Sequence, residues 1–221
     1  MRGYFVHLMV RSKKELAVLL SKLKGFENPN VQLEQYQTPS EIAAEWVWEM
    51  ALKGEVEGKV IAEFASGPGI IGIGLLILGA KKLHFVDVDE KIMEVCKQNY
   101  KLIFEDYHIG EAEFHLNDIK NLDLSESKSE IDIVVQNPPF GTKEKHIDKV
   151  FLEKAFSNAA VVYSMHKSTT KSFVEAISKD FNFKITHNWF YKFPLPKTMK
   201  HHKKKTEYVD VDLWRMEKNI F

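Results

Sequence analysis

The segment Asn137-Pro138-Pro139-Phe140 places an amide, two prolines and an aromatic ring directly after the apolar run 131–135. Prolines lack a backbone N–H and fix φ, so a strand that reaches them must end and hold one shape. The amide oxygen and a proline carbonyl accept hydrogen bonds, while the ring offers a stacking face. This combination predicts a rigid lip that grips a planar amine, such as the exocyclic amine of a nucleobase. The alternative, an Asx turn before the prolines, leaves the exposed aromatic unexplained.

A glycine-containing turn upstream has the features of a nucleoside-binding half-site. The apolar run 60–65 leads into Ser66-Gly67-Pro68-Gly69, where glycines let the backbone approach a ligand and the following helix offers free N–H groups. The next apolar run ends in Asp87, whose carboxylate can accept hydrogen bonds from ribose hydroxyls. NAD enzymes and S-adenosylmethionine enzymes both use such a half-site. A tight turn followed by a helix-capping aspartate is the structural alternative.

Other polar residues have two interpretations each. Asp118 follows an expected strand and can either reach the adenine of a cofactor or cap the turn 119–122. The basic run 197–205 is the one charge run that suggests nucleic acid, although most such runs are merely solvated. His201 and His202 within it have no Asp, Glu or Cys at ligand spacing, so we expect no metal site there.

Composition limits the number of domains and the classes of protein to which the chain could belong. The chain has 221 residues, 44% of them apolar, and 31 basic residues balance 31 acidic ones, so one domain without a global electrostatic field is expected. The single cysteine, Cys96, excludes an internal disulfide and a thiolate zinc site, and favours a reduced, cytoplasmic compartment. The start 1–10 makes a poor signal peptide, and the apolar run 69–80 is too short to span a bilayer.

Alternating apolar runs predict an α/β sheet whose strands end at these polar residues. We expect residues 1–38 to form an extension with a helix and a lid segment, and residues 39–221 to form one domain. Thr38 is expected to cap a helix that begins at Pro39, with Glu41 completing a capping box. The expected strands are 59–65, 83–87, 113–117, 131–136, 160–164, 181–189 and 207–215, and the expected helices are 13–24, 39–52, 69–78, 90–104, 148–158 and 168–179. Ligands of such sheets bind at the carboxyl ends of the strands.

Several motifs in a fixed order resemble one known family. They are 33–38 (LEQYQT), 137–143 (NPPFGTK), 162–167 (VYSMHK) and 202–205 (HKKK). Together with the glycine turn they resemble the methyltransferase-like protein 5 family, the S-adenosylmethionine-dependent adenine-N6 methyltransferases of small-subunit ribosomal RNA, including its archaeal members. The resemblance covers nearly the whole chain, from about residue 20 to residue 215. It implies a Rossmann-like methyltransferase fold with a seven-stranded, mostly parallel sheet, helices on both faces and an N-terminal helical extension.

The resemblance also implies roles for individual residues and a partner. Asn137 to Phe140 would bind the target adenine, with Asn137 also next to the cofactor. A small zinc-ribbon activator subunit would add to the sheet edge beside the strand 113–117. The residues implied at the cofactor are Gln35, Thr38, Glu63, Ala65, Gly67, Gly69, Asp87 and Asp118, and those implied at RNA are Lys143, His166, Lys203, Lys204 and Lys205.

The glycine turn departs from the family pattern. The usual Asp-Leu-Gly-x-Gly-x-Gly is here 63–69 (EFASGPG), so that Glu63 stands for aspartate and Ala65 for the first glycine. If position 65 needs a positive φ, alanine costs on the order of 1 kcal/mol.

The sequence leaves three possible functions open. They are adenine-N6 methylation of ribosomal RNA, methylation of another planar amine (a glutamine side chain, guanine N2 or cytosine N4), or a cofactor-impaired scaffold that binds RNA or a partner. An NAD dehydrogenase is disfavoured because no hydride-relay site is visible.

Overall fold

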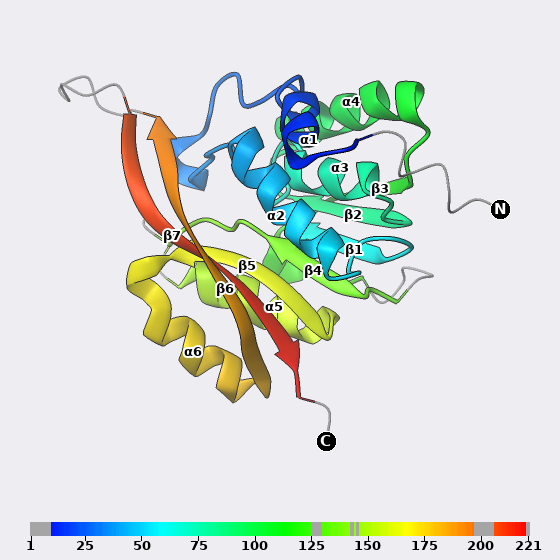
Figure 1. Cartoon of the computed structure of the whole chain (residues 1–221). Coiled ribbons are helices and arrows are strands. Elements are labelled where there is room, and N and C mark those ends of the chain that lie inside the picture. The colour runs from blue at the N-terminus through cyan, green and yellow to red at the C-terminus, as the bar shows by residue number, and fades with distance from the viewer. Residues whose placement is uncertain (1–9, 125–129, 142–143, 145, 197–205, 220–221) are drawn as a thin grey trace.

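A seven-stranded sheet forms the centre of the protein (Figure 1) in a computed structural model that describes residues 10–124, 130–141, 144, 146–196 and 206–219. The strand order is β3-β2-β1-β4-β5-β7-β6. The strands from β3 to β5 run parallel, and β7 runs antiparallel to both β5 and β6. The predicted Rossmann-like fold with a seven-stranded, mostly parallel sheet is confirmed.

The elements alternate along the chain much as expected. The strands are β1 (Val60–Phe64), β2 (Lys82–Asp87), β3 (Glu111–Leu116), β4 (Ile133–Gln136), β5 (Val161–Lys167), β6 (Phe183–Pro196) and β7 (Thr206–Lys218). The α-helices are α1 (Lys13–Leu20), α2 (Ser40–Leu52), α3 (Ile70–Ile77), α4 (Glu90–Tyr107), α5 (Ile147–Asn158) and α6 (Lys171–Asp180). Three short 3₁₀ helices are η2 (Val31–Leu33), η3 (Ile119–Asn121) and η4 (Ser168–Thr170).

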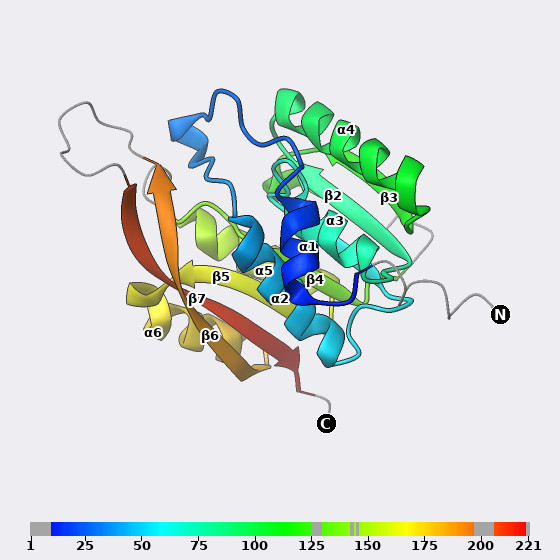
Figure 2. The same ribbon diagram turned by 45° about the horizontal axis from the view of Figure 1, so that its top comes forward.

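Helices cover both faces of the sheet (Figures 1 and 2). Helices α1 to α4 lie on one face, where Leu16 and Trp46 join the apolar side chains of α3 in one buried cluster. Helices α5 and α6 lie on the other face, where Phe151 and Val174 belong to a second cluster. Every residue of β1 is buried, because helices cover both faces of this central strand, and all of its residues except Glu63 are apolar. Among the described residues, no helix is long and apolar enough to cross a membrane.

The start of α2 differs from the expected capping box. The helix begins at Ser40, its N-cap is Pro39, and no side chain caps it. Thr38 is almost fully buried, and its hydroxyl oxygen instead accepts a hydrogen bond from the Asn137 side chain. The predicted cap was wrong, because the tertiary contact with Asn137 takes the oxygen that a cap would use.

The last two strands are longer than expected and form a ribbon that extends past β5 (Figure 1). Alternation continues beyond the expected end of β6, because Phe190 is exposed while Phe193 is buried. Pro194 lies within β6 and pairs with Tyr208 of β7. The strand can hold this proline because β6 is an edge strand, whose outer N–H groups have no neighbour in the sheet.

Candidate active site

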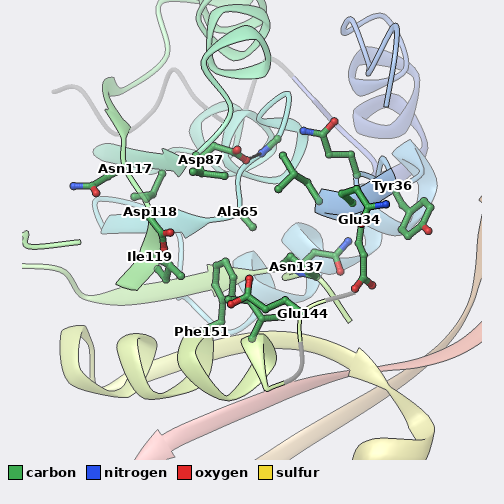
Figure 3. Close-up of a pocket in the computed structure, with 18 of the residues that line it drawn as sticks. Glu34, Tyr36, Ala65, Asp87, Asn117, Asp118, Ile119, Asn137, Glu144 and Phe151 are labelled. Carbon is green, nitrogen blue, oxygen red and sulfur yellow. Dashed lines mark hydrogen bonds between the residues drawn. The ribbon is translucent and has the colours of Figure 1, made fainter. Parts of the chain in front are cut away.

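A pocket opens at the carboxyl ends of the parallel strands, where the sequence predicts a ligand (Figure 3). Its walls come from the turn after β1, the end of β2, the segments after β3 and β4, the start of α5, and the segment 32–36, which covers one side. The lining residues are Phe26, Gln32, Leu33, Glu34, Gln35, Tyr36, Ala65, Gly67, Val86, Asp87, Val88, Asn117, Asp118, Ile119, Lys120, Asn137, Pro139, Glu144, Ile147 and Phe151. Of the predicted site residues, Gln35, Ala65, Gly67, Asp87, Asp118, Asn137 and Pro139 are among them.

The glycine turn adopts the left-handed backbone at three of its positions. The φ angles are 52° at Ala65, 53° at Gly67 and 82° at Gly69. A Cβ at Gly67 would lie 3.0 Å from the Phe26 ring, and one at Gly69 would lie 2.5 Å from the Cys96 sulfur. Gly69 is the N-cap of α3 and does not line the pocket, so packing beneath the turn is what requires glycine there.

Alanine at position 65 pays a backbone penalty that glycine would avoid. An L-residue in the left-handed region is destabilised by about 1–2 kcal/mol, which glycine avoids. Glycine also raises the conformational entropy of the unfolded chain, which offsets part of that gain. We therefore expect Ala65→Gly to raise the free energy of unfolding by up to about 1 kcal/mol in denaturant titration. Ala17→Gly, within α1, is the matched control and should lower stability by about 1 kcal/mol. A loss of stability in Ala65→Gly would contradict the strain.

Glu63 lies beneath the turn and outside the pocket. It is 2% exposed, and its Oε2 accepts a hydrogen bond from the backbone N–H of Gly72 at 2.9 Å. Burial raises the pKa of Glu63 to about 8, and nearby Asp87 acts in the same direction. The resemblance placed Glu63 at the cofactor, whereas the structure shows it anchoring the first turn of α3.

The raised pKa of Glu63 predicts a pH-dependent stability. The carboxyl holds its proton in the folded state up to about pH 8 but ionises in the unfolded chain near 4.5. Its contribution is thus fully present below the unfolded pKa and is lost as pH rises toward 8, at about 1.4 kcal/mol per unit of difference. We expect the free energy of unfolding to fall by a few kcal/mol across this window, and Glu63→Gln to remove most of that slope. Glu94→Gln, on the exposed face of α4, should keep it; an unchanged slope in Glu63→Gln would refute the assignment.

Asp87 ends β2 and organises the turn from the opposite side. Its two carboxylate oxygens accept the backbone N–H groups of Gly67 at 2.8 Å and of Asp89 at 3.0 Å. Burial raises the pKa of Asp87, while these two hydrogen bonds act against that rise. Each oxygen keeps a further lone pair, and the side chain lines the pocket (Figure 3), so Asp87 can accept hydroxyl donors from a ligand.

The segment after β3 serves two purposes at once. The Asp118 carboxylate accepts the backbone N–H of Lys120 at 2.9 Å and so caps η3, yet Asp118 also lines the pocket. The cap is therefore observed, and the contact with a cofactor's adenine stays a prediction. Asn117, its neighbour, lines the pocket as well and was not singled out from the sequence.

The Asn137 side chain presents an unpaired acceptor. Its Nδ2 donates to the Thr38 hydroxyl oxygen at 3.0 Å, while its buried Oδ1 has no hydrogen-bond partner among the described residues. Asn137 lines the pocket on the side opposite Asp87 (Figure 3). Buried polar atoms are rarely left unpaired, so an oxygen in this position calls for a donor from a ligand. An exocyclic amine is such a donor.

Phe140 is held by contacts from three distant elements. Its backbone N–H donates to the Glu34 carboxylate at 3.1 Å. Its ring meets Phe193 of β6 edge-on, with centroids 6.3 Å apart, and the Lys167 ammonium lies 5.7 Å from the ring centroid. Phe140 and Pro138 do not line the pocket. The Phe140 ring lies outside it and contacts side chains of β5 and β6.

The segment 34–38 connects the two halves of the site. Gln35 donates to the Asp89 carboxylate at 2.8 Å on the Asp87 side of the pocket, whereas Glu34 and Thr38 bond the Asn137–Phe140 lip. Glu34 is 7% exposed and has a positive φ of 50°. Sequence reasoning missed Glu34, since its only signal was its position inside the 33–38 motif. Its partner, Phe140, is far away in the chain.

Of the residues predicted to contact RNA, the structure describes only His166. His166 is 2% exposed inside β5, and its Nε2 lies 2.6 Å from the Ser164 hydroxyl. Burial lowers the pKa of His166 to about 3, so the ring is neutral and cannot meet a phosphate. The structure corrects that prediction. Lys143 and Lys203–Lys205, like the rest of the basic run 197–205, lie outside the described residues.

Sequence and structure comparisons show which known proteins this chain is similar to. Residues 43–185 match the family described as Conserved hypothetical protein 95. The chain is 32% identical to the rRNA N(6)-adenosine-methyltransferase METTL5 of Danio rerio, over 91% of this chain and 97% of that protein. It is 34% identical to the uncharacterized protein MJ0284 of Methanocaldococcus jannaschii, over 93% and 94%. The crystal structure of PH1948 from Pyrococcus horikoshii, a proposed RNA methyltransferase, is 41% identical and superimposes with a TM-score of 0.83 over 96% of this chain and 100% of that one.

Proposed function

The chain belongs to the METTL5 family of methyltransferases, and we propose that it methylates the N6 amine of an adenine in small-subunit ribosomal RNA with S-adenosylmethionine as donor. One observation carries the choice of an amine. Asn137, whose buried Oδ1 has no partner among the described residues, lines the same pocket as Gly67 and Asp87, so an amine acceptor and a nucleoside cofactor would share one pocket. The METTL5 relatives are named for this reaction on rRNA.

The residues on the donor side fit S-adenosylmethionine. The left-handed turn at Ala65 and Gly67 leaves its backbone open to the pocket, Asp87 offers carboxylate lone pairs to ribose hydroxyls, and Asp118 is placed for an adenine amine. Gln35 covers this side from the lid. When bound, the cofactor supplies a methyl group activated by its positively charged sulfur.

The residues on the acceptor side orient and polarise the target amine. The nitrogen of adenine N6 is a poor nucleophile because its lone pair delocalises into the ring. Hydrogen bonds to the Asn137 Oδ1 and the Pro138 carbonyl draw the amine toward tetrahedral geometry and localise that lone pair. Phe140 stacks on the base, a contact of roughly 1–3 kcal/mol. The chain needs no dedicated base, since the methylated amine loses its proton to solvent.

The pocket also restricts the form of the RNA. A base must leave its stack to reach a lip at the end of a strand, so an unpaired or flipped adenine is the substrate. Lys167, over the Phe140 ring, is placed to meet the backbone of such a nucleotide. The basic run 197–205, which joins β6 to β7, would extend this contact along the RNA.

The edge of the sheet at β3 suits the proposed zinc-ribbon activator subunit. β3 has a neighbour on one side only, so its outer backbone groups can pair with a strand from another chain. Leu116 of β3 is exposed, and α4, which packs against β3, carries the exposed Leu102 and Phe104. A partner that adds a strand there would cover them and support the segment that carries Asn117 and Asp118.

Tritiated methyl transfer tests the proposed function. Purified small ribosomal subunits and their extracted RNA are incubated with the chain, alone and with a small zinc-ribbon activator, and the labelled nucleoside is identified by mass spectrometry. We expect N6-methyladenosine in small-subunit RNA. Label in guanosine, cytidine or protein glutamine would move the reaction to another amine. If calorimetry shows no binding of S-adenosylmethionine, the chain is not a methyltransferase of this kind, and a scaffold that binds RNA becomes the better explanation.

Glu34 is expected to act as a positioning residue for the lip. In Glu34→Ala the Phe140 N–H loses its acceptor, a change of about 1 kcal/mol that should lower kcat roughly fivefold while the Kd for S-adenosylmethionine stays near its original value. Glu34→Gln keeps an amide oxygen in the same place and should recover most of the rate. Glu41→Ala, exposed at the start of α2, is the control. Equal losses in the Ala and Gln variants would instead require the negative charge.

A further inference from the structure

Two histidines and a glutamate converge on one face of β2 and β3, away from the methyl-transfer pocket. His84 lies on β2, and Glu113 and His115 lie two residues apart on β3 and so share a face. One ligand atom from each residue lies within 4.8 Å of the other two. These side chains take no part in the proposed methyl transfer, and none lines the pocket.

The separations match those between ligands of one metal ion. His84 Nδ1 lies 3.1 Å from His115 Nε2 and 3.3 Å from the nearer oxygen of Glu113. Ligands that bind zinc tetrahedrally at about 2.0–2.1 Å lie about 3.3 Å from one another. Three ligand atoms can therefore surround an ion with little rearrangement. We propose that His84, Glu113 and His115 bind one divalent ion of the zinc class.

The chemistry of the donor set favours an ion at this place. Two imidazoles and a carboxylate are a set that zinc accepts, with a fourth position left for water or another ligand.

An ion would replace the direct contact between the two rings. His84 Nδ1 lies within hydrogen-bond distance of His115 Nε2 and 3.3 Å from a Glu113 oxygen, and its buried Nε2 has no partner among the described residues. An ion accepts one lone pair from each group at once. It requires the His84 tautomer with its proton on Nε2, and that unpaired N–H weakens binding without preventing it.

Two features define how the site would behave. Lys82 Nζ lies 2.5 Å from the Glu113 oxygen and competes with a cation for it. β3 is the edge strand, with few fully buried side chains, so an ion would tie it to β2. These two strands lead to Asp87 and to Asp118, which means that a bound ion would stiffen the walls of the pocket without touching them.

Zinc content under competition tests the site. The full chain, without an affinity tag and dialysed against a chelator, is titrated with Zn²⁺ in the presence of a chromophoric chelator. All proteins carry His201→Ala and His202→Ala, since adjacent histidines bind metals unspecifically. We expect one tightly bound equivalent that is absent in His115→Ala and present in His108→Asn, an exposed position elsewhere. Equal zinc in both variants, or none in the parent, overturns the site.

A second variant tests the competition with Lys82. Lys82→Met removes an ammonium next to the proposed ion, so zinc affinity should rise about tenfold. Unchanged affinity would show that Glu113 is not a ligand, and the three-residue site would fail. Cobalt substitution gives an independent readout, because a three-ligand protein site should produce a visible absorption band that His115→Ala abolishes. Thermal unfolding with and without Zn²⁺ should show stabilisation only in proteins that keep the equivalent.

Discussion

Asn137→Ala should lower kcat for methyl transfer by about 10²–10³-fold, the usual effect of removing one aligned polar group from a reaction centre. Asn137 lines the pocket and carries an Oδ1 without a partner among the described residues, and the variant would leave the target amine without that acceptor. The Kd for S-adenosylmethionine should change far less than kcat, because the turn and Asp87 remain. Single-turnover tritium transfer to small-subunit RNA, together with calorimetry for the cofactor, separates the two quantities.

Two further variants sharpen this test. Asn137→Asp keeps an oxygen toward the pocket and should retain more activity than alanine. Asn158→Ala, at the end of α5, removes an amide far from the pocket and should leave kcat unchanged. Methyl transfer by Asn137→Ala at the parent rate would show that the amine is held by other groups.

Asp87→Ala should weaken S-adenosylmethionine binding by about 100-fold or more, since hydrogen bonds to a charged group contribute about 1.5–3 kcal/mol each. The carboxylate anchors the N–H groups of Gly67 and Asp89 and faces the pocket, so its loss removes both a ligand contact and the support of the turn. Calorimetry measures the Kd, and thermal unfolding reports how much of the loss comes from the turn.

The control for Asp87 is an exposed carboxylate on the neighbouring helix. Asp106→Ala, on α4, should keep the parent Kd. If Asp87→Ala also binds the cofactor at the parent Kd, the nucleoside lies elsewhere in the pocket and the assignment of the β2 end fails. Raising the RNA concentration should not restore activity in Asp87→Ala, because the defect lies on the donor side.

The order of strands and helices was readable from the chain, because buried parallel strands are continuous apolar runs and helices repeat every three to four residues. β1, β2 and α4 fall close to their expected bounds. The ends of β6 and β7 did not, since both strands continue past their expected ends at 189 and 215. The sequence indicated that Ala65 would be strained if its φ were positive, and the φ of 52° meets that condition.

Contacts between distant segments could not be predicted from the sequence. Thr38 was expected to cap a helix and instead bonds Asn137, and His166 was expected near RNA and is buried. Glu34 gave no signal of its contact with Phe140. His84 and His115 come together only because β2 and β3 pair in a particular register. Each of these depends on which side chains two remote segments bring into contact, which local propensity does not encode.

The sequence by itself determined which residues lie at or just after the ends of the parallel strands, and since parallel strands end at one edge, it placed Ala65, Asp87, Asp118 and Asn137 around a common pocket. Tertiary structure alone decided how the segment 34–38 bridges that pocket and which atom of Asn137 is left unpaired. The physical reason is that strand ends follow from periodicity along the chain, whereas hydrogen-bond partners follow from packing across it.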